Sequence, residues 1–199
     1  MLRGFNKLFW ISSILCVLTT NASATPLQWN SGSGANKNWY ELVSAQVTWT
    51  EANAAANAAT YLGLRGHLVT ITSAEENTFI GDLIATDELV WIGLTDQDSE
   101  GSFKWVTNEP FVYSNWNGGE PSDGGAGEDF AEFIGFAGAE FGKWNDLSNT
   151  SGGGRFYVIE YEYEAPVPTP ALSELATVLL GMLVIGIAGL RIRGSGLAS

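Results

Sequence analysis

The segment that most constrains the fold of this chain runs from Asn115 to Asp129, N-W-N-G-G-E-P-S-D-G-G-A-G-E-D, and we name it the acidic loop. It has neither the period of an amphipathic helix nor the alternation of a strand, and its glycines and proline interrupt regular structure. Four carboxylates lie within ten residues, with no Lys or Arg among them: Glu120, Asp123, Glu128 and Asp129. Like charges this close repel, so a folded loop that carries them needs a bound cation or screening by water.

Two interpretations of the acidic loop are therefore open. Carboxylate and backbone carbonyl oxygens, on a glycine-rich segment that can curl, are the ligands that calcium prefers. A run of charge is also typical of a loop that is simply solvated, and this is the usual interpretation of such a loop in isolation. The rest of the chain has to decide between the two.

Composition and charge restrict the partners. The chain has 199 residues, 45% of them apolar, which suffices for one domain and is thin for two. The formal net charge of -13 excludes nucleic acid and anionic membrane surfaces, because both require clusters of Lys and Arg. Abundant glycine (24 residues) and 12% aromatic residues favour short strands and long structured loops over a helical bundle.

Residues 1–24 are typical of a secretory signal peptide. Two basic residues precede an apolar run, Leu8 to Leu18, and Ala22-Ser23-Ala24 is a cleavage site of the A-x-A kind. The run is short for a membrane anchor, which is the minor alternative. Cys16 is the only cysteine and lies in this run, so the mature chain is expected to be exported without disulfides.

The C-terminus predicts a second sorting element. A Pro-rich linker at 165–174 precedes a helix at 175–193, which begins with sixteen uncharged residues and closes with two arginines, and a tail at 194–199 follows. This favours a short transmembrane helix over a buried core helix. The order of parts resembles the PEP-CTERM signal of exopolysaccharide-producing Gram-negative bacteria, although Thr169 stands where that signal usually has Glu. The resemblance implies processing by an exosortase.

Between these elements the chain is expected to hold a lead at 25–37 and a domain at 38–164. Two helices are predicted, one from about Thr50 to Tyr61 and one from Ala74 to Ile84, where Ser73 and Glu76 form a capping box. Strands are predicted at 38–48, 67–71, 90–94, 130–136 and 155–162, with short aromatic pieces at 103–106 and 111–116. A loop-rich excursion as long as 95–144 indicates function.

Several short sequence motifs of this domain occur in the order found in C-type lectins. They are W-T-E-A at Trp49–Ala52, G-H-L-V-T-I-T-S at Gly66–Ser73, E-E-N at Glu75–Asn77, W-I-G-L at Trp91–Leu94, E-G-S-F-K-W at Glu100–Trp105, N-W at Asn115–Trp116, G-E-P-S at Gly119–Ser122, E-D at Glu128–Asp129, W-N-D at Trp144–Asp146 and F-Y-V-I-E at Phe156–Glu160. From Asn38 to about Glu162 the chain resembles the C-type lectin domain. The resemblance implies an α+β, C-type lectin-like fold, in which two helices flank short antiparallel strands and a long calcium-binding loop region.

The resemblance also implies a binding site. In calcium-dependent members the residues that hold both the metal and the sugar match Glu120, Ser122, Glu128, Asn145 and Asp146. A second, structural calcium in many members uses residues that match Asp96, Glu100, Asp123, Glu128 and Asp129. Calcium takes six to eight oxygens, so it can coordinate two sugar hydroxyls while carboxylates accept from them and the Asn145 amide donates to them. Pro121 is expected to follow a cis peptide bond, as in this family.

Two departures from the family pattern stand out. Ser122 replaces the usual Asn, and its hydroxyl lacks the two donors of an amide, which leaves a preference for mannose-type sugars open. The four cysteines of the family are also missing. Ala56 with Ile159, and Phe130 with Asn149, stand at the matching positions.

The sequence thus predicts a calcium-dependent carbohydrate-binding domain without enzymatic activity. The chain is expected to be exported, anchored in the inner membrane and then held at the cell surface or in the extracellular matrix, where its own exopolysaccharide is a candidate ligand. The alternative is an adhesion or scaffold protein that binds protein partners, with calcium purely structural. A glycosidase is disfavoured because so short a domain has little chain to build a deep cleft, and His67 is expected to be structural.

Overall fold

The computed structural model describes residues 24–84, 88–124, 127–150 and 153–165. The chain divides into two units, 1–163 and 164–199, and the helices and strands found in the described residues belong to the first. The predicted signal peptide and the predicted helix at 175–193 lie outside the described residues. Within the described part, the helices are too short or too polar to cross a membrane.

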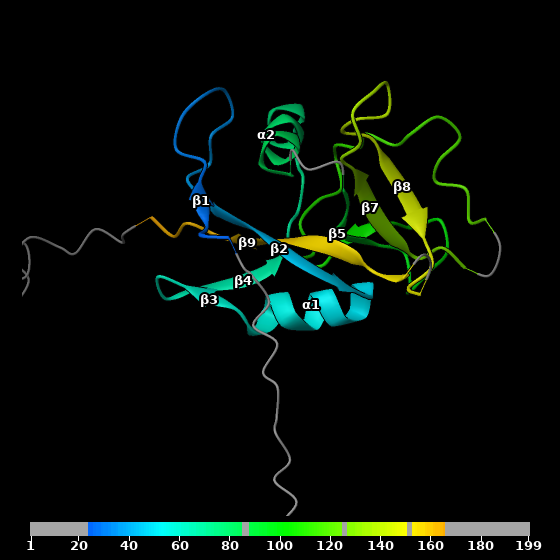
Figure 1. Cartoon of the computed structure of the whole chain (residues 1–199), viewed down its shortest axis with the longest axis horizontal. Helices are drawn as coiled ribbons and strands as arrows, with labels where there is room; N and C mark the ends of the chain where they lie inside the picture. The colour runs from blue at the N-terminus through cyan, green and yellow to red at the C-terminus, as the bar shows by residue number, and fades with distance from the viewer. Residues whose placement is uncertain (1–23, 85–87, 125–126, 151–152, 166–199) are drawn as a thin grey trace, which may run out of the picture. The chain divides into compact units, whose positions relative to one another are not determined.

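The described residues form a mixed sheet and two helices, arranged as in Figure 1. The sheet order is β1-β2-β9-β5-β7-β8, with β3, β4 and β6 attached beside this path. The strands are β1 (Leu27–Gln28), β2 (Trp39–Val47), β3 (Thr60–Tyr61), β4 (Leu64–Leu68), β5 (Leu89–Thr95), β6 (Lys104–Trp105), β7 (Phe130–Ile134), β8 (Trp144–Leu147) and β9 (Arg155–Tyr161), and the helices are α1 (Trp49–Ala58) and α2 (Ala74–Ile84).

The expectation of an antiparallel sheet is wrong at one pair of strands. β5 and β9 run parallel, with Val90 opposite Phe156 and Trp91 opposite Tyr157. The connection between them, residues 96–154, contains the loop-rich excursion with β6, β7 and β8, and only a long connection lets the chain return in the same direction. This connection therefore makes the central parallel pair of strands possible, and it also contains the acidic loop.

Other boundaries differ by a few residues. β4 begins at Leu64 rather than His67, because it forms a hairpin with β3. That hairpin also ends the first helix at Ala58, before the predicted Tyr61. The aromatic piece at 111–116 forms no strand and makes only an isolated bridge, between Trp116 and Trp144.

The helices lie on opposite sides of the central strands (Figure 1). α1 begins with a capping box between Thr48 and Glu51. α2 has its predicted bounds, and the Ser73 hydroxyl accepts from the Glu76 backbone N–H at 3.1 Å. The Glu76 carboxylate, however, accepts from the Thr72 backbone N–H at 2.8 Å, one residue before the predicted cap.

Buried packing and hydrogen bonds take the place of the missing disulfides. Ala56 and Ile159 are both buried in one apolar cluster. At the other matching pair, Phe130 stacks on Trp49 with ring centroids 4.6 Å apart. Asn149 instead binds the start of α1, since its Oδ1 accepts from the Thr50 backbone N–H at 3.1 Å. Non-covalent contacts thus hold the segments that a disulfide joins elsewhere.

Candidate functional site

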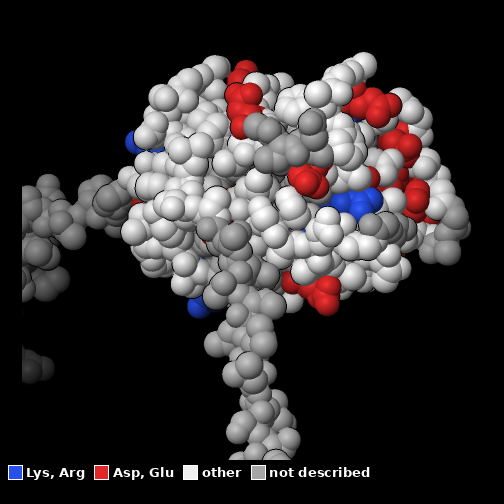
Figure 2. Space-filling view, in the orientation of Figure 1, with Lys and Arg blue, Asp and Glu red and all other residues white. Residues whose placement is uncertain are grey.

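The acidic loop leaves the sheet beside β8 and is tied to it at its start. The Trp144 backbone N–H donates to the Asn115 carbonyl at 2.9 Å, and the Asn117 N–H donates to the Trp144 carbonyl at 2.8 Å. The Trp116 and Trp144 rings meet edge to face, 5.8 Å apart. In Figure 2, Asp and Glu side chains gather on the side where β8 lies in Figure 1.

Asp146 on β8 is the anchor over which the loop folds. It is 2% exposed. Both its carboxylate oxygens accept from the Ser122 backbone N–H at 3.0 Å, and Oδ2 also accepts from the Asp123 N–H at 3.0 Å. The Glu120–Pro121 peptide bond at the head of this turn is cis, as the family pattern implied. A buried carboxylate therefore holds the turn through two backbone N–H groups.

Glu128 closes the loop from its other end. Its Oε2 accepts from the Gly124 backbone N–H at 2.7 Å and from the Ser122 hydroxyl at 3.5 Å. The Glu128 backbone N–H donates in turn to Asp123 Oδ1 at 3.2 Å. These contacts bring together Ser122, Glu128 and Asp146, three of the five residues predicted to hold the sugar.

Glu120 joins this group with an unsatisfied oxygen. Its Oε2 is buried and has no hydrogen-bond partner in the described part of the chain. Desolvation is the main reason why the pKa of Glu120 is raised. The Ser122 hydroxyl lowers this pKa, while the Asp146 carboxylate, which can share a proton with Glu120 and is negatively charged, and the charge of Glu128 raise it further. A buried carboxylate oxygen without a donor is costly, and a cation at this position removes the cost.

Asn145, on β8 beside Asp146, has one of its amide N–H groups engaged within the protein. Its Nδ2 donates to Glu132 Oε1 at 3.2 Å, and Glu132 Oε2 accepts from Arg155 Nε at 2.6 Å. Sequence reasoning missed both Glu132 and Arg155. The available signal was a charged residue in the middle of the otherwise apolar strand F-A-E-F-I, which marks a buried and therefore paired charge.

A second group of carboxylates lies at the end of β5. Asp96, Glu100 and Asp129 offer ligand atoms that all lie within 4.8 Å of one another. Asp96 is 1% exposed, and its Oδ1 is buried without a partner among the described residues. The pKa of Glu100 is raised, first by desolvation and then by the charges of Asp96 and Asp123. The Asp123 charge acts on Glu100, although Asp123 is not one of the three carboxylates that meet within 4.8 Å. The Glu128 side chain instead contacts Ser122 and Gly124.

The donor sets of both groups fit calcium. Each offers several carboxylate oxygens, with a buried oxygen that has no donor in the described residues, Glu120 Oε2 in one group and Asp96 Oδ1 in the other. Hard oxygen ligands on a curled loop suit calcium, which accepts flexible geometry, better than magnesium or zinc.

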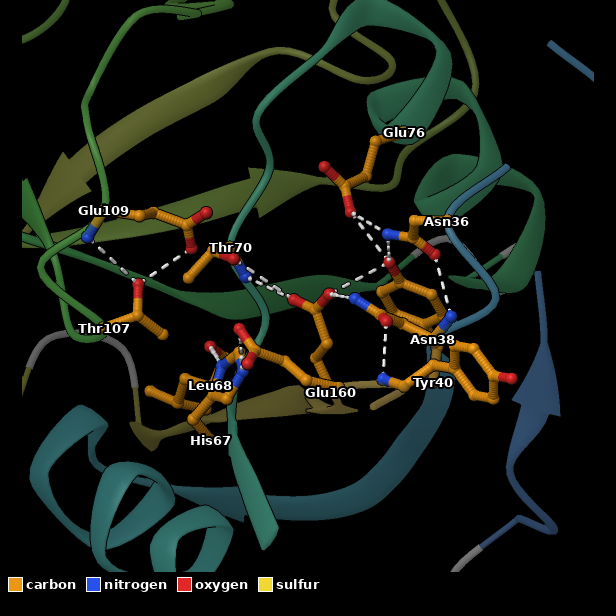
Figure 3. A network of polar contacts seen from close by, with 12 residues as sticks. Asn36, Asn38, Tyr40, His67, Leu68, Thr70, Glu76, Thr107, Glu109 and Glu160 are labelled. Atoms are coloured by element: carbon orange, nitrogen blue, oxygen red, sulfur yellow. Dashed lines mark hydrogen bonds and ion pairs between the residues drawn. The ribbon is translucent and has the colours of Figure 1, made fainter. Parts of the chain in front are cut away.

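A third set of carboxylates is buried away from the loop, between β2, α2 and β9 (Figure 3). The Tyr40 hydroxyl lies 2.7 Å from Glu76 Oε1 and 3.0 Å from Glu160 Oε1. Glu160 Oε2 accepts from the Thr70 backbone N–H at 3.1 Å. Burial, followed by the Glu76 charge, raises the pKa of Glu160 to about 7, while His67 lowers it.

His67 belongs to the edge of this network and makes structural contacts. Its Nδ1 lies 2.9 Å from the Leu68 carbonyl, and its Nε2 lies 3.6 Å from a Glu162 carboxylate oxygen. Asn36 and Asn38 complete the network, since their Nδ2 groups donate to Glu76 at 3.2 Å and to Glu160 at 2.7 Å. Glu76 and Glu160 belong to separate sequence motifs, and no local pattern predicts that their side chains meet.

Residues 45–152 match the family described as Lectin C-type domain. The chain is 35% identical over 126 residues to halomucin of Haloquadratum walsbyi, and the matched segment covers 60% of this chain and 1% of halomucin. It is 38% identical over 117 residues to the low affinity immunoglobulin epsilon Fc receptor of Mus musculus, and that match covers 55% of this chain and 32% of the receptor. The chain therefore spans less than a third of either relative's length.

Solved structures share the fold. The cow C-type carbohydrate-recognition domain of CD23, determined in the presence of a GlcNAc2Man3 oligosaccharide, is 32% identical and superimposes with a TM-score of 0.56. That match covers 72% of this chain and 100% of the cow domain.

Proposed function

The chain belongs to the C-type lectin domain family, and from this premise we propose that its domain binds carbohydrate through calcium held by the acidic loop. Membership confirms the predicted α+β lectin fold and a binding domain rather than an enzyme. The proposal rests on the buried Glu120 oxygen that has no hydrogen-bond partner among the described residues, because this oxygen lies in one group with Asp146 and Glu128. A purely solvated acidic loop gives no reason for burying such an oxygen.

The residues proposed to hold calcium and sugar are Glu120, Ser122, Glu128, Asn145 and Asp146. Calcium would supply coordination positions for two neighbouring sugar hydroxyls. Glu120 and Glu128, as acceptors, can receive the protons of those hydroxyls, and the remaining N–H of Asn145 can donate to one of them. Asp146 holds the turn through the backbone of Ser122 and Asp123.

A second calcium is proposed at Asp96, Glu100, Asp123 and Asp129, with a structural role. Its carboxylates belong to two segments that are distant in sequence, the turn after β5 and the end of the acidic loop. An ion between them would join the turn to the loop and relieve their mutual repulsion. Because the Glu128 N–H donates to Asp123, ordering at this position would extend to the proposed sugar site.

The class of ligand is supported by one relative. The structure of the cow CD23 domain was determined in the presence of a GlcNAc2Man3 oligosaccharide, and the similarity to this chain extends over the whole of the cow domain. We therefore propose a glycan with neighbouring hydroxyls as ligand, with a surface exopolysaccharide as the natural candidate. A glycan array probed in calcium and in chelator tests the proposal: signals only in calcium are expected, and an array without signals favours the scaffold alternative.

We further propose that the chain is exported and held at the cell surface or in the matrix by its predicted C-terminal signal. The support is the sequence of residues 1–24 and 165–199 alone. N-terminal sequencing of the protein recovered outside the cytoplasm is expected to begin at Thr25. A chain that keeps Met1 would contradict the cleavage and leave the alternative of an N-terminal anchor.

A further inference from the structure

Asn145 in the proposed sugar site is the end of a chain of three side chains that crosses the sheet. Glu132 on β7 lies directly opposite Asn145 on β8. Glu132 Oε1 accepts from Asn145 Nδ2 at 3.2 Å, and Glu132 Oε2 accepts from Arg155 Nε at 2.6 Å. The Glu132 and Arg155 side chains are only 5% and 13% exposed, and the guanidinium lies over the Trp91 ring, 5.8 Å from its centroid.

The chemistry of these three groups fixes the orientation of the amide. A carboxylate only accepts hydrogen bonds and a guanidinium only donates them, whereas an amide does both and can turn over. Arg155 is a donor toward Glu132, so Glu132 meets Asn145 as a carboxylate that needs a donor. The N–H branch of the amide must therefore point to Glu132, which leaves Oδ1 on the opposite branch.

We propose that Glu132, paired with Arg155, is a positioning residue that fixes the Asn145 amide with Oδ1 available to the metal. This inference rests on the proposed function, because it assigns a role at the same calcium site. It also limits the role of the amide toward sugar, since one N–H is committed to Glu132. The pair is proposed to contact neither ion nor sugar, and to act only through Asn145.

Glu132→Gln tests the inference while preserving the shape of the side chain. Arg155 needs an acceptor, so the carbonyl of the introduced glutamine will face Arg155 and its NH2 group will face Asn145. Asn145 must then turn over and present Oδ1 to that NH2 group, which removes Oδ1 from the metal. We expect the calcium affinity of the purified chain, measured by calorimetry, to fall about 10- to 100-fold, as for other partners that orient a metal ligand.

A second substitution distinguishes orientation from a general loss of structure. An aspartate at position 145 carries an oxygen on both branches. The double variant E132Q/N145D can therefore accept from the introduced glutamine and still offer an oxygen to calcium, and it is expected to recover most of the affinity that E132Q loses. N145D alone places two carboxylates face to face and is expected to be worse than the double variant.

Glu76→Gln is the matched control, because Glu76 is 3% exposed and Glu132 is 4% exposed. It should leave calcium affinity unchanged, and melting in calcium-free buffer should show that all variants fold. The inference would be overturned if E132Q bound calcium with wild-type affinity. It would also be overturned if the double variant E132Q/N145D bound calcium no more tightly than E132Q. If the wild-type chain itself binds no calcium, the proposed function fails and the positioning role fails with it, a result distinct from either of those.

Discussion

Replacing Glu120 with glutamine is expected to abolish calcium-dependent glycan binding and, in calcium-free buffer, to make the protein more stable. Glu120 Oε2 is buried without a donor among the described residues, beside Asp146 and Glu128. Glutamine removes one negative charge and puts an NH2 group, which cannot ligate calcium, on one branch. We expect at least about a 100-fold loss of calcium affinity, which corresponds to about 2.7 kcal/mol.

The gain in calcium-free stability has the same cause as the loss of function. The raised pKa of Glu120 means that the folded protein disfavours its charged form. The neutral glutamine escapes that penalty, so its melting temperature in chelator should exceed that of the wild type. Glu75→Gln on the exposed face of α2 is the control with the same chemical change, and it should alter neither quantity. Wild-type calcium affinity in E120Q would exclude Glu120 as a ligand.

The free energy of unfolding of the calcium-free protein is expected to fall as the pH rises from about 5 to about 8. Burial raises the pKa of Glu160 to about 7, above its ordinary value of 4.5, so between these values the folded state binds more protons than the unfolded state. The contribution of Glu160 to the free energy of unfolding is then fully present below its pKa in the unfolded state, and it is lost as the pH rises through its pKa in the folded state. At about 1.4 kcal/mol per pKa unit, the loss is on the order of 3 kcal/mol.

The contacts around the Tyr40 hydroxyl also favour a proton on Glu160 in the folded state. The Tyr40 hydroxyl has one proton, yet it lies 2.7 Å from Glu76 Oε1 and 3.0 Å from Glu160 Oε1. If both carboxylates are ionised, only one of these contacts can be a hydrogen bond. A proton on Glu160 supplies the second, since Glu160 can donate to Tyr40 while Tyr40 donates to Glu76.

Urea unfolding of the wild type and of Glu160→Gln at several pH values measures this effect. The variant lacks the titrating group, so its stability should change much less between pH 5 and 8. Glu51→Gln, at the exposed start of α1, is the control and should keep the wild-type slope. Wild-type stability that increases with pH across this window would contradict a protonated Glu160.

Local signals in the sequence were sufficient for part of this fold. α2 has the predicted bounds because Ser73 caps it and its apolar residues follow a helical period. Trp91, in the predicted strand at 90–94, is fully buried, as the apolar character of that strand indicates. The glycines and carboxylates around Pro121 likewise indicated a loop that can curl, and the contacts of Glu128 with Ser122 and Gly124 are local in sequence. The anchor of the turn, Asp146, comes from a distant strand.

The remainder depended on residues that are far apart in the chain. The parallel pairing of β5 and β9 is set by where the loop-rich excursion returns, and no local pattern encodes that return. Glu132 and Arg155 lie in different strands, so their ion pair could not be inferred from spacing. The sequence identified Asn145 as a candidate ligand, but the orientation of its amide follows from that pair.

Calcium-dependent carbohydrate binding by this domain can be measured directly on a glycan array. The purified chain is applied to a glycan array in millimolar calcium, in chelator, and in chelator followed by restored calcium. We expect glycan signals in calcium that vanish in chelator and return when the ion is restored. Signals that persist unchanged in chelator, or an array that stays blank in calcium, would contradict calcium-dependent carbohydrate binding.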